Sequence, residues 1–388
     1  MTEKKRVIAL GFFDGVHIGH AALIRKALEI GEYENLVPSV ITFDAHPQSL
    51  VSGETVPLIN SPEDRAGLIR RMFGVDEIIF LHFDRETARM SWDSFIHHIT
   101  SEFGARYLVA GHDFRFGCGG QGNSDLLAKK CGELGLGCEI IPEVMLDGVV
   151  SSSTYIRDLI SAGDIERAND FLGHPHVLTD VVRYGYRLGR TLGTPTINMC
   201  FGADVLVPAF GVYATRAFLC EAEQTENAAQ FVTAQASTAH TSTPHISTPH
   251  TSAPQASTPH ISTPHTSAPQ ASALHNSASQ ASAPQASAPH TSTPHTSAPQ
   301  ASSNSNQTDC ARGLTGVTNI GVRPTVGNSG LINAETHILD YDGHLYGHQV
   351  RIEFHTRLRP EMKFGDKNEL KAQIHKDCGQ ARAFFANR

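Results

Sequence analysis

The sequence lacks the features that mark membrane-spanning, zinc-binding or disulfide-stapled proteins. No stretch approaches the roughly 18 apolar residues that a membrane span needs. Seven cysteines occur in 388 residues without a CxxC pair or a dense framework, so neither a zinc site nor a disulfide scaffold is indicated. The start, MTEKKRVIALGFFDG, lacks the apolar core of a signal peptide. We therefore expect a cytoplasmic protein with no membrane partner.

Positive charge is also in short supply. Lysine and arginine total 31 against 39 aspartate and glutamate residues, which gives a formal net charge of -8. This balance argues against a nucleic-acid partner held by a general positive field. The length suits two domains of ordinary size, each with its own core.

Proline is concentrated in one unusual stretch, residues 236–300. It consists of thirteen consecutive pentapeptides patterned on x-S-x-P-H and x-S-x-P-Q, and it holds ten of the twenty prolines. Low hydrophobicity and recurrent proline prevent a packed core or a helix, so we expect a disordered, partly polyproline II segment. Its histidines are diluted with Ser, Thr and Pro, which does not favour a specific metal site. We interpret residues 221–312 as an insertion in a surface loop.

The first half alternates short apolar runs with helical periods. Strand-like runs occur at 7–13, 36–43, 77–83, 107–111 and 138–144, and helical patterns at 21–30, 65–73, 91–103 and 125–135 lie between them. This alternation predicts a parallel sheet covered by helices. Residues 151–163 and 164–173 then predict two consecutive helices, which Gly163 and Gly173 end. We place the domain boundary after residue 176.

The second half has a different texture. Short β-rich runs separated by glycine, at 177–186, 211–219, 316–322, 335–341 and 349–354, predict a compact antiparallel barrel. A closing helix is expected over 368–386.

The string GFFDGVHIGH joins the first expected strand to the first helix. A glycine turn there lets backbone amides and a helix N-terminus face an anion. His17 and His20 lie three apart on one side of that helical start, where imidazole donors can stabilise charge on an α-phosphate and a departing pyrophosphate. The HIGH string alone indicates only a nucleotidylyl transferase, with cytidylyl or pantetheine-phosphate substrates still open.

The same string resembles the signature of the FAD synthetase module in prokaryotic bifunctional riboflavin kinase/FAD synthetases. The resemblance continues through TFDAHP (42–47), GHDFRFG (111–117) and SSSTYIR (151–157). It implies that SSSTYIR closes over the triphosphate and that Arg157 neutralises the leaving pyrophosphate, for which its planar fork of donors is suited. Phe12 departs from the small residue that is frequent at its position. The residues implied to bind ATP or flavin in this domain are Gly11, Phe13, Asp14, Gly15, His46, Asp113, Phe116, Ser152, Ser153 and Thr154.

The second half resembles riboflavin kinases through five motifs in order. These are GYRLGRTLGTPTIN (185–198), VPAFGVYAT (207–215), TNIGVRPT (318–325), ETHILDYDGHLYG (335–347) and LRPEMKF (358–364). The resemblance implies that Thr196 and Asn198 hold the nucleotide-bound magnesium and that Glu335 is the general base. Asp180 stands where the family often has glycine. The residues implied to bind ATP or flavin here are Gly185, Gly189, Arg190, Gly193, Asn319, Arg323, Thr325, Arg359 and Glu361.

We therefore expect two successive reactions: riboflavin and MgATP give FMN in the C-terminal barrel, and FMN and MgATP give FAD and pyrophosphate in the N-terminal domain. Mg²⁺ is the expected cofactor, and the partners are riboflavin, FMN and ATP; self-association stays open. One alternative is a riboflavin kinase whose N-terminal domain only binds a regulatory nucleotide. Another is a flavin-binding or repeat-mediated interaction protein. Intact His17, His20, Ser153 and Arg157 argue against the first alternative. The lack of a PxxP core in the repeats and the presence of Thr196, Asn198 and Glu335 argue against the second.

Overall fold

The computed structural model describes residues 4–53, 55–185, 193–220, 313–322, 332–386 and 388. The predicted insertion at 221–312 lies outside these residues. So do four of the expected kinase-site residues, which are Gly189, Arg190, Arg323 and Thr325.

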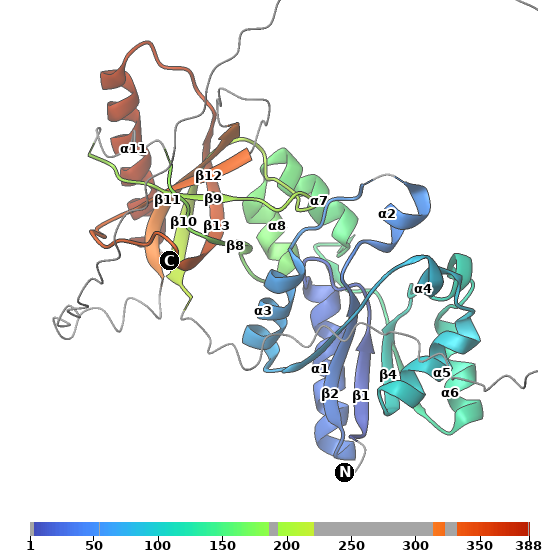
Figure 1. Ribbon diagram of the computed structural model, residues 1–388. Helices are drawn as coiled ribbons and strands as arrows, with labels where there is room; N and C mark the ends of the chain where they lie inside the picture. Colours follow the sequence, from blue (N-terminus) through green and yellow to red (C-terminus); the bar gives the residue numbers. More distant parts are fainter. Residues whose placement is uncertain (1–3, 54, 186–192, 221–312, 323–331, 387) are drawn as a thin grey trace, which may run out of the picture. The chain divides into compact units, whose positions relative to one another are not determined.

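The N-terminal half is built on a five-stranded parallel sheet in the order β3-β2-β1-β4-β5 (Figure 1). Its elements are β1 (Arg6–Leu10), α1 (Ile18–Glu34), β2 (Val37–Phe43), α2 (Pro47–Ser52), α3 (Pro62–Phe73), β3 (Glu77–Leu81), α4 (Arg85–Arg89), α5 (Trp92–Glu102), β4 (Ala105–Gly111), the 3-10 helix η1 (Cys118–Gly120), α6 (Ser124–Leu134) and β5 (Gly137–Ile141). The expected parallel sheet with covering helices is confirmed.

Alternation along β1 explains why helices cover both faces of this sheet. Val7 and Ala9 share a buried cluster with residues of α1 and α3, whereas Ile8 and Leu10 share another with residues of α5 and α6. Successive side chains of a strand point to opposite faces, so an apolar strand of this kind requires cover on both. The GFFDG loop leaves the carboxyl end of this central strand, where ligands bind in open α/β sheets.

A small hairpin of β6 (Met145–Leu146) and β7 (Val149–Val150) precedes two consecutive helices, α7 (Ser153–Ala162) and α8 (Ile165–Leu172). Ser152 and Asp164 cap their N-termini, and Gly163 and Gly173 end them with φ of 84° and 75°. Only glycine adopts this left-handed conformation without a steric penalty. The two predicted helices and their stops are confirmed.

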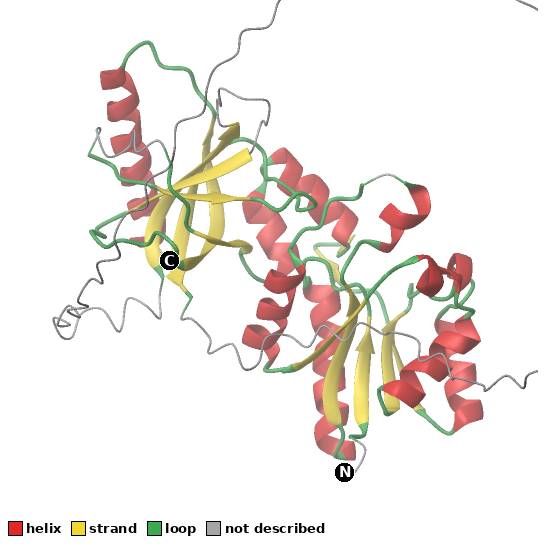
Figure 2. Cartoon of the chain, viewed as in Figure 1, coloured by secondary structure: helices red, strands yellow, loops and turns green. Residues whose placement is uncertain are grey.

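The C-terminal half is a six-stranded sheet whose paired strands are all antiparallel, in the order β8-β13-β10-β11-β12-β9 (Figure 2). The elements are β8 (His176–Val181), β9 (Ile197–Cys200), β10 (Gly211–Leu219), β11 (Leu314–Val322), β12 (Ile332–Ile338), β13 (Gln349–Pro360) and α11 (Lys367–Ala386). An isolated bridge between Arg183 and Asn198 brings the chain after β8 back to β9, so the barrel is nearly closed. The predicted barrel is confirmed.

The closing helix α11 is also confirmed. Cys378 and Ala381 of α11 are buried against Val212 and Ala214 of β10. The barrel interior shares one hydrophobic cluster with residues of α7 and α8, such as Ile160. Because this cluster includes residues from both sides of residue 176, it marks no boundary there, and the domain boundary stays a prediction.

Candidate active sites

His17 and His20 stand together at the start of α1. Their rings stack with centroids 3.7 Å apart and an interplanar angle of 25°. His17 is the N-cap of the helix, because its Nδ1 accepts the backbone N–H of Gly19 at 3.2 Å. Since a backbone amide can only donate, Nδ1 carries no hydrogen, and the neutral ring presents Nε2–H as its donor.

Both rings are neutral near physiological pH. Burial, aided by His174 and the positive charge of Arg157, lowers the pKa of His17 to about 3. Burial also holds the pKa of His20 well below its ordinary value, and His17 and Arg65 act in the same direction. A buried imidazole of this kind offers a hydrogen bond rather than a positive charge to a phosphate.

Hydrogen bonds connect the SSSTYIR segment to the GFFDG loop and to His17, which follows it. Ser151 Oγ lies 3.3 Å from His17 Nδ1, and Ser153 Oγ donates to the backbone carbonyl of Asp14 at 2.9 Å. Ser152 caps α7 by accepting the N–H of Tyr155. Two segments more than a hundred residues apart in sequence therefore share one site, as the motif comparison predicts.

Arg157 and Asp14 form the charged link of this site. Arg157 Nη2 contacts Asp14 Oδ2 at 2.7 Å, and Arg157 Nε donates to the carbonyl of Pro57 at 2.9 Å. The fully buried Asp14 carboxylate also accepts the backbone N–H groups of Ile59 and Asn60. Asp14 thus orients the guanidinium while leaving Nη1 uncommitted by these contacts.

Arg65, a residue of α3 that sequence reasoning missed, is fully buried beside this link. Its Nη1 donates to Thr42 Oγ1 at 3.0 Å and to the carbonyl of Phe43 at 2.8 Å, and its guanidinium lies 4.5 Å above the ring of Phe12. Burial lowers the pKa of Arg65 to about 10, so it stays charged at neutral pH. Arg65 falls on the buried face of the predicted helix, and that unusual position was the available signal.

The remaining predicted residues of this domain have different environments. Phe13 is buried in the core with φ of 54°, and Phe116 is buried against Phe95 and Phe114. His46 caps α2 and its ring lies 4.8 Å from that of Phe12. Asp113 and Thr154 are exposed. Gly15 is buried in the GFFDG loop, with φ of 83°. Ligand roles for these residues stay predictions.

Three polar residues of the barrel lie in one row across adjacent strands. Glu335 of β12 is directly opposite Asn198 of β9 on one side and Asn319 of β11 on the other. Residues in register on neighbouring strands point to the same face, so the predicted base and a predicted magnesium ligand are immediate neighbours. Glu335 is half-buried, whereas Asn198 is buried.

The carboxamide of Asn198 is tightly enclosed. A Cβ atom at Gly185 would collide with it, which accounts for glycine at that position. The carboxamide of Asn333, which sequence reasoning did not single out, donates to Asn198 Oδ1 at 2.8 Å and to Glu335 Oε1 at 3.2 Å. Nearby, His337 Nδ1 lies 2.8 Å from the carbonyl of Pro195 and fixes the turn that carries Thr196. Gly193, with φ of 80°, begins this turn.

Two residues that we expect near the flavin make contacts within the barrel. Arg359 binds the buried carboxylate of Asp377 on α11 through Nε and Nη2, at 3.0 and 2.8 Å. Glu361 is exposed and its carboxylate lies over Gly321. Asp180, the departure noted above, accepts the backbone N–H of Cys200 at 2.8 Å and pairs with Arg183.

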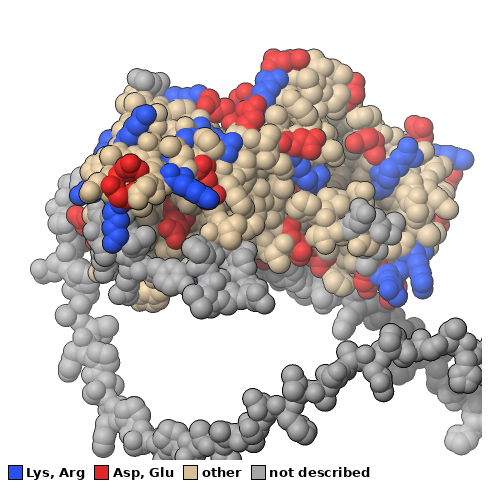
Figure 3. Space-filling view, turned by 90° about the horizontal axis from the view of Figure 1, so that it is seen from above, with Lys and Arg blue, Asp and Glu red and all other residues tan. Residues whose placement is uncertain are grey.

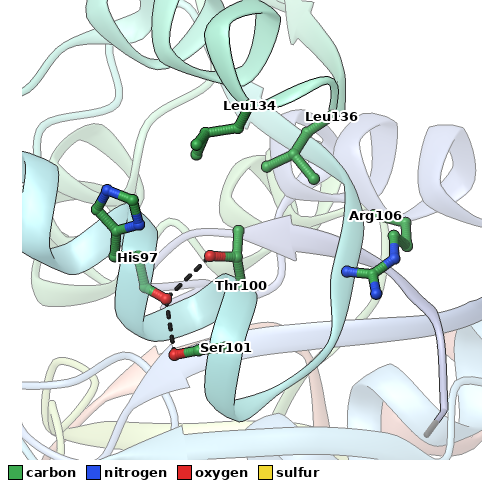
Figure 4. Close-up of a pocket in the computed structure, with 6 residues that line it drawn as sticks. All are labelled: His97, Thr100, Ser101, Arg106, Leu134 and Leu136. Carbon is green, nitrogen blue, oxygen red and sulfur yellow. Dashed lines mark hydrogen bonds between the residues drawn. The ribbon is translucent and has the colours of Figure 1, made fainter.

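A hollow of about 330 Å³ is lined by residues of α5, β4, α6 and the turn that follows α6 (Figure 4). Its hydroxyl groups, Thr100 and Ser101, bond to the carbonyl of His97 within their own helix. It holds none of the predicted site residues. Figure 3 shows basic and acidic side chains interspersed over the face in view, without a continuous patch of either sign.

No helix in the described ranges is long and apolar enough to cross a membrane. The cytoplasmic location, the lack of a nucleic-acid partner and the state of self-association stay predictions.

Two family models match the chain. One, described as FAD synthetase, matches residues 1–155; the other, described as riboflavin kinase, matches residues 172–261 and 282–385. Similar curated proteins include the bifunctional riboflavin kinase/FMN adenylyltransferases of Listeria monocytogenes and Escherichia coli, both 27% identical. The first alignment covers 99% of this chain and 94% of the relative, and the second 98% and 92%.

A solved structure titled a macrolide-efflux protein from Streptococcus pneumoniae has the same fold. Its TM-score is 0.67 at 22% identity, and the match covers 98% of this chain and 95% of that one. This similarity bears on the fold alone.

The fold and the two sites define an ATP-dependent transferase with two catalytic domains. With both family models matched in order along the chain, it belongs to the bifunctional riboflavin kinase/FAD synthetase family. The interpretation as a kinase with a merely regulatory N-terminal domain is not favoured, because the FAD synthetase match spans that domain.

Proposed function

We propose that the barrel phosphorylates riboflavin to FMN and that the parallel-sheet domain adenylylates FMN to FAD. The observation that carries the first reaction is the row Asn198, Glu335 and Asn319 on three adjacent strands. It supports a division in which a carboxylate handles the substrate proton and neutral oxygen donors handle the nucleotide.

In the kinase reaction the ribityl 5'-hydroxyl attacks the γ-phosphorus of ATP, and the bond to the β-phosphate oxygen breaks to release ADP. Glu335 accepts the hydroxyl proton as the new P–O bond forms. The half-buried setting of Glu335 limits its contact with water while leaving one side open to substrate. Little covalent chemistry is required of the protein, since positioning dominates phosphoryl transfer.

Asn198 and Thr196 suit a hard cation. Asn198 Oδ1 accepts one hydrogen bond, from Asn333, and a carbonyl oxygen has a second lone pair. Mg²⁺ prefers such oxygen donors, keeps several waters, and when bound with ATP neutralises charge on the β- and γ-phosphates. Thr196 lies two residues before Asn198, directly before β9, and residues two apart along an extended strand face the same side.

In the adenylyl transfer a phosphate oxygen of FMN attacks the α-phosphorus of ATP, and pyrophosphate leaves. His17 presents Nε2–H at the N-terminus of α1, where the helix dipole also favours anions. Asp14 and Pro57 hold the guanidinium of Arg157, which supports a role for Arg157 in neutralising the leaving pyrophosphate. These groups stabilise charge directly, so no covalent enzyme intermediate is required.

A time course tests the proposal. Purified protein is mixed with riboflavin and MgATP, and flavins are separated by chromatography at intervals. We expect FMN to form first and FAD to follow. FMN alone would support a kinase with an inactive N-terminal domain, and the absence of both products would refute the proposal.

A further inference from the structure

Asn333 is a buried carboxamide at the junction of the proposed kinase groups. It lies on β12 two residues before Glu335, and its side chain reaches Asn198 on the neighbouring strand. Only 4% of Asn333 is exposed. Its two hydrogen-bond acceptors are the proposed base, two residues away, and a proposed magnesium ligand, 135 residues away in the sequence.

The orientation of this carboxamide is defined on both sides. Its Nδ2 group has two hydrogens, and two oxygens lie within reach, Asn198 Oδ1 at 2.8 Å and Glu335 Oε1 at 3.2 Å. Its Oδ1 lies 3.9 Å from Cys200 Sγ, whose thiol donates to it. The flipped carboxamide would place an oxygen against two oxygens, so the observed orientation is the one that satisfies every partner.

We propose that Asn333 is a positioning residue for the kinase reaction, holding the Asn198 and Glu335 oxygens at a fixed separation and angle. This inference rests on the proposed function of those two residues. One hydrogen of Asn333 fixes the plane of the Asn198 carboxamide and leaves the second lone pair of its oxygen free for a cation. The other hydrogen limits rotation of the Glu335 carboxylate. Partners of this kind often change metal affinity or activity by 10- to 100-fold when removed.

A structural role alone is the competing explanation, because a buried polar side chain also contributes to stability. The sheet provides a matched control on the opposite face of the same strand. Thr336 is fully buried, and its hydroxyl bonds to Thr318 Oγ1 at 2.8 Å within the barrel interior. Replacing Thr336 with valine removes a comparable buried hydrogen bond without touching Asn198 or Glu335.

The experiment compares Asn333→Leu, Asn333→Asp and Thr336→Val in the full chain. Asn333→Leu removes both donors, and Asn333→Asp keeps the shape but sets a carboxylate against two oxygens. We expect kcat for FMN formation to fall about 10- to 100-fold in both Asn333 variants, with the KM for riboflavin little changed. FAD formation from supplied FMN, measured on the same samples, reports that the N-terminal domain is folded and should stay at the parent rate.

Calorimetric titration with MgADP, and with ADP in a chelator, gives a second readout that does not depend on turnover. We expect one MgADP-binding component to weaken about tenfold in the Asn333 variants, while metal-free ADP binding is unchanged. Thr336→Val should keep both the kcat and the MgADP affinity.

Parent-like kcat and MgADP affinity in the Asn333 variants would overturn the inference, as would an equal loss of kcat in Thr336→Val. Glu335→Gln separates this failure from that of the proposed function. If Glu335→Gln still forms FMN, the proposed role of Glu335 fails; if it forms none while the Asn333 variants are unaffected, only the inference fails.

Discussion

The imidazole rings of His17 and His20 stack with centroids 3.7 Å apart, at the point where the central parallel strand passes into α1. His17 is buried, His20 is half-buried, and both rings have pKa values below the ordinary range, with burial as the main cause. This arrangement provides directed N–H donors without placing two positive charges side by side.

Substituting His17 with asparagine tests this donor. Asparagine is a good N-cap and can still accept the N–H of Gly19, so α1 should keep its start. The ring Nε2–H is lost, and removing one such donor typically lowers kcat about 10²- to 10³-fold. We expect that loss in FAD formation from supplied FMN, with riboflavin phosphorylation unchanged. A parent-like rate of FAD formation would contradict the role of His17.

The buried ring of His176 leads to a prediction of how the free energy of unfolding depends on pH. Its ring is fully buried near Phe354, neither ring nitrogen has a hydrogen-bond partner among the described residues, and burial lowers its pKa to about 3. Between this pKa and the ordinary value of 6.5, the unfolded ring binds a proton that the folded ring does not. Stability is therefore lost as pH falls below about 6.5 and regained above it.

His176→Leu should remove this dependence. At pH 5 the cost of keeping the ring neutral is about 2 kcal/mol, and at pH 8 it vanishes. Urea denaturation should therefore show a larger gain in the free energy of unfolding at pH 5 than at pH 8. The exposed His375 on α11 supplies the control, since His375→Leu should change stability similarly at both pH values. An equal effect of His176→Leu at the two pH values would refute the assignment.

The pentapeptide segment predicts tolerance to deletion. Residues 236–300 fall in the connection between β10 and β11, and loop-closure entropy changes by only about 0.6 kcal/mol for each doubling of length. Deleting them should leave both FMN and FAD formation near the parent rates. A large loss of riboflavin phosphorylation, measured against FAD formation on the same sample, would show that the segment acts in the kinase reaction.

Much of the architecture could be predicted because its signals are local. Alternating apolar strands and amphipathic helices define the parallel sheet, and glycines end α7 and α8 where the helical periods stop. The motifs also predict that SSSTYIR and GFFDG share one site. The hydrogen bond from Ser153 to the carbonyl of Asp14 is consistent with that prediction.

Contacts set by tertiary packing could not be predicted in the same way. Asn333 reaches Asn198 only because β12 and β9 pair in a particular register, which no local pattern specifies. The pairing of Arg359 with Asp377 depends on how α11 packs against the barrel. A motif shows which functional group a long polar side chain carries but not which group it binds. Arg359 could therefore be read from sequence either as a flavin contact or as one partner of a buried ion pair.

The central claim is that one chain divides two transfer reactions between two separate sites, and Glu335→Gln tests it most directly. Glutamine keeps the size of the side chain and can still accept the N–H of Asn333, but it cannot take the hydroxyl proton. Riboflavin phosphorylation and FAD formation from supplied FMN are measured on the same preparation. We expect FMN formation to be abolished and FAD formation to continue at the parent rate. Equal loss of both activities, or unchanged FMN formation, would contradict this division of labour.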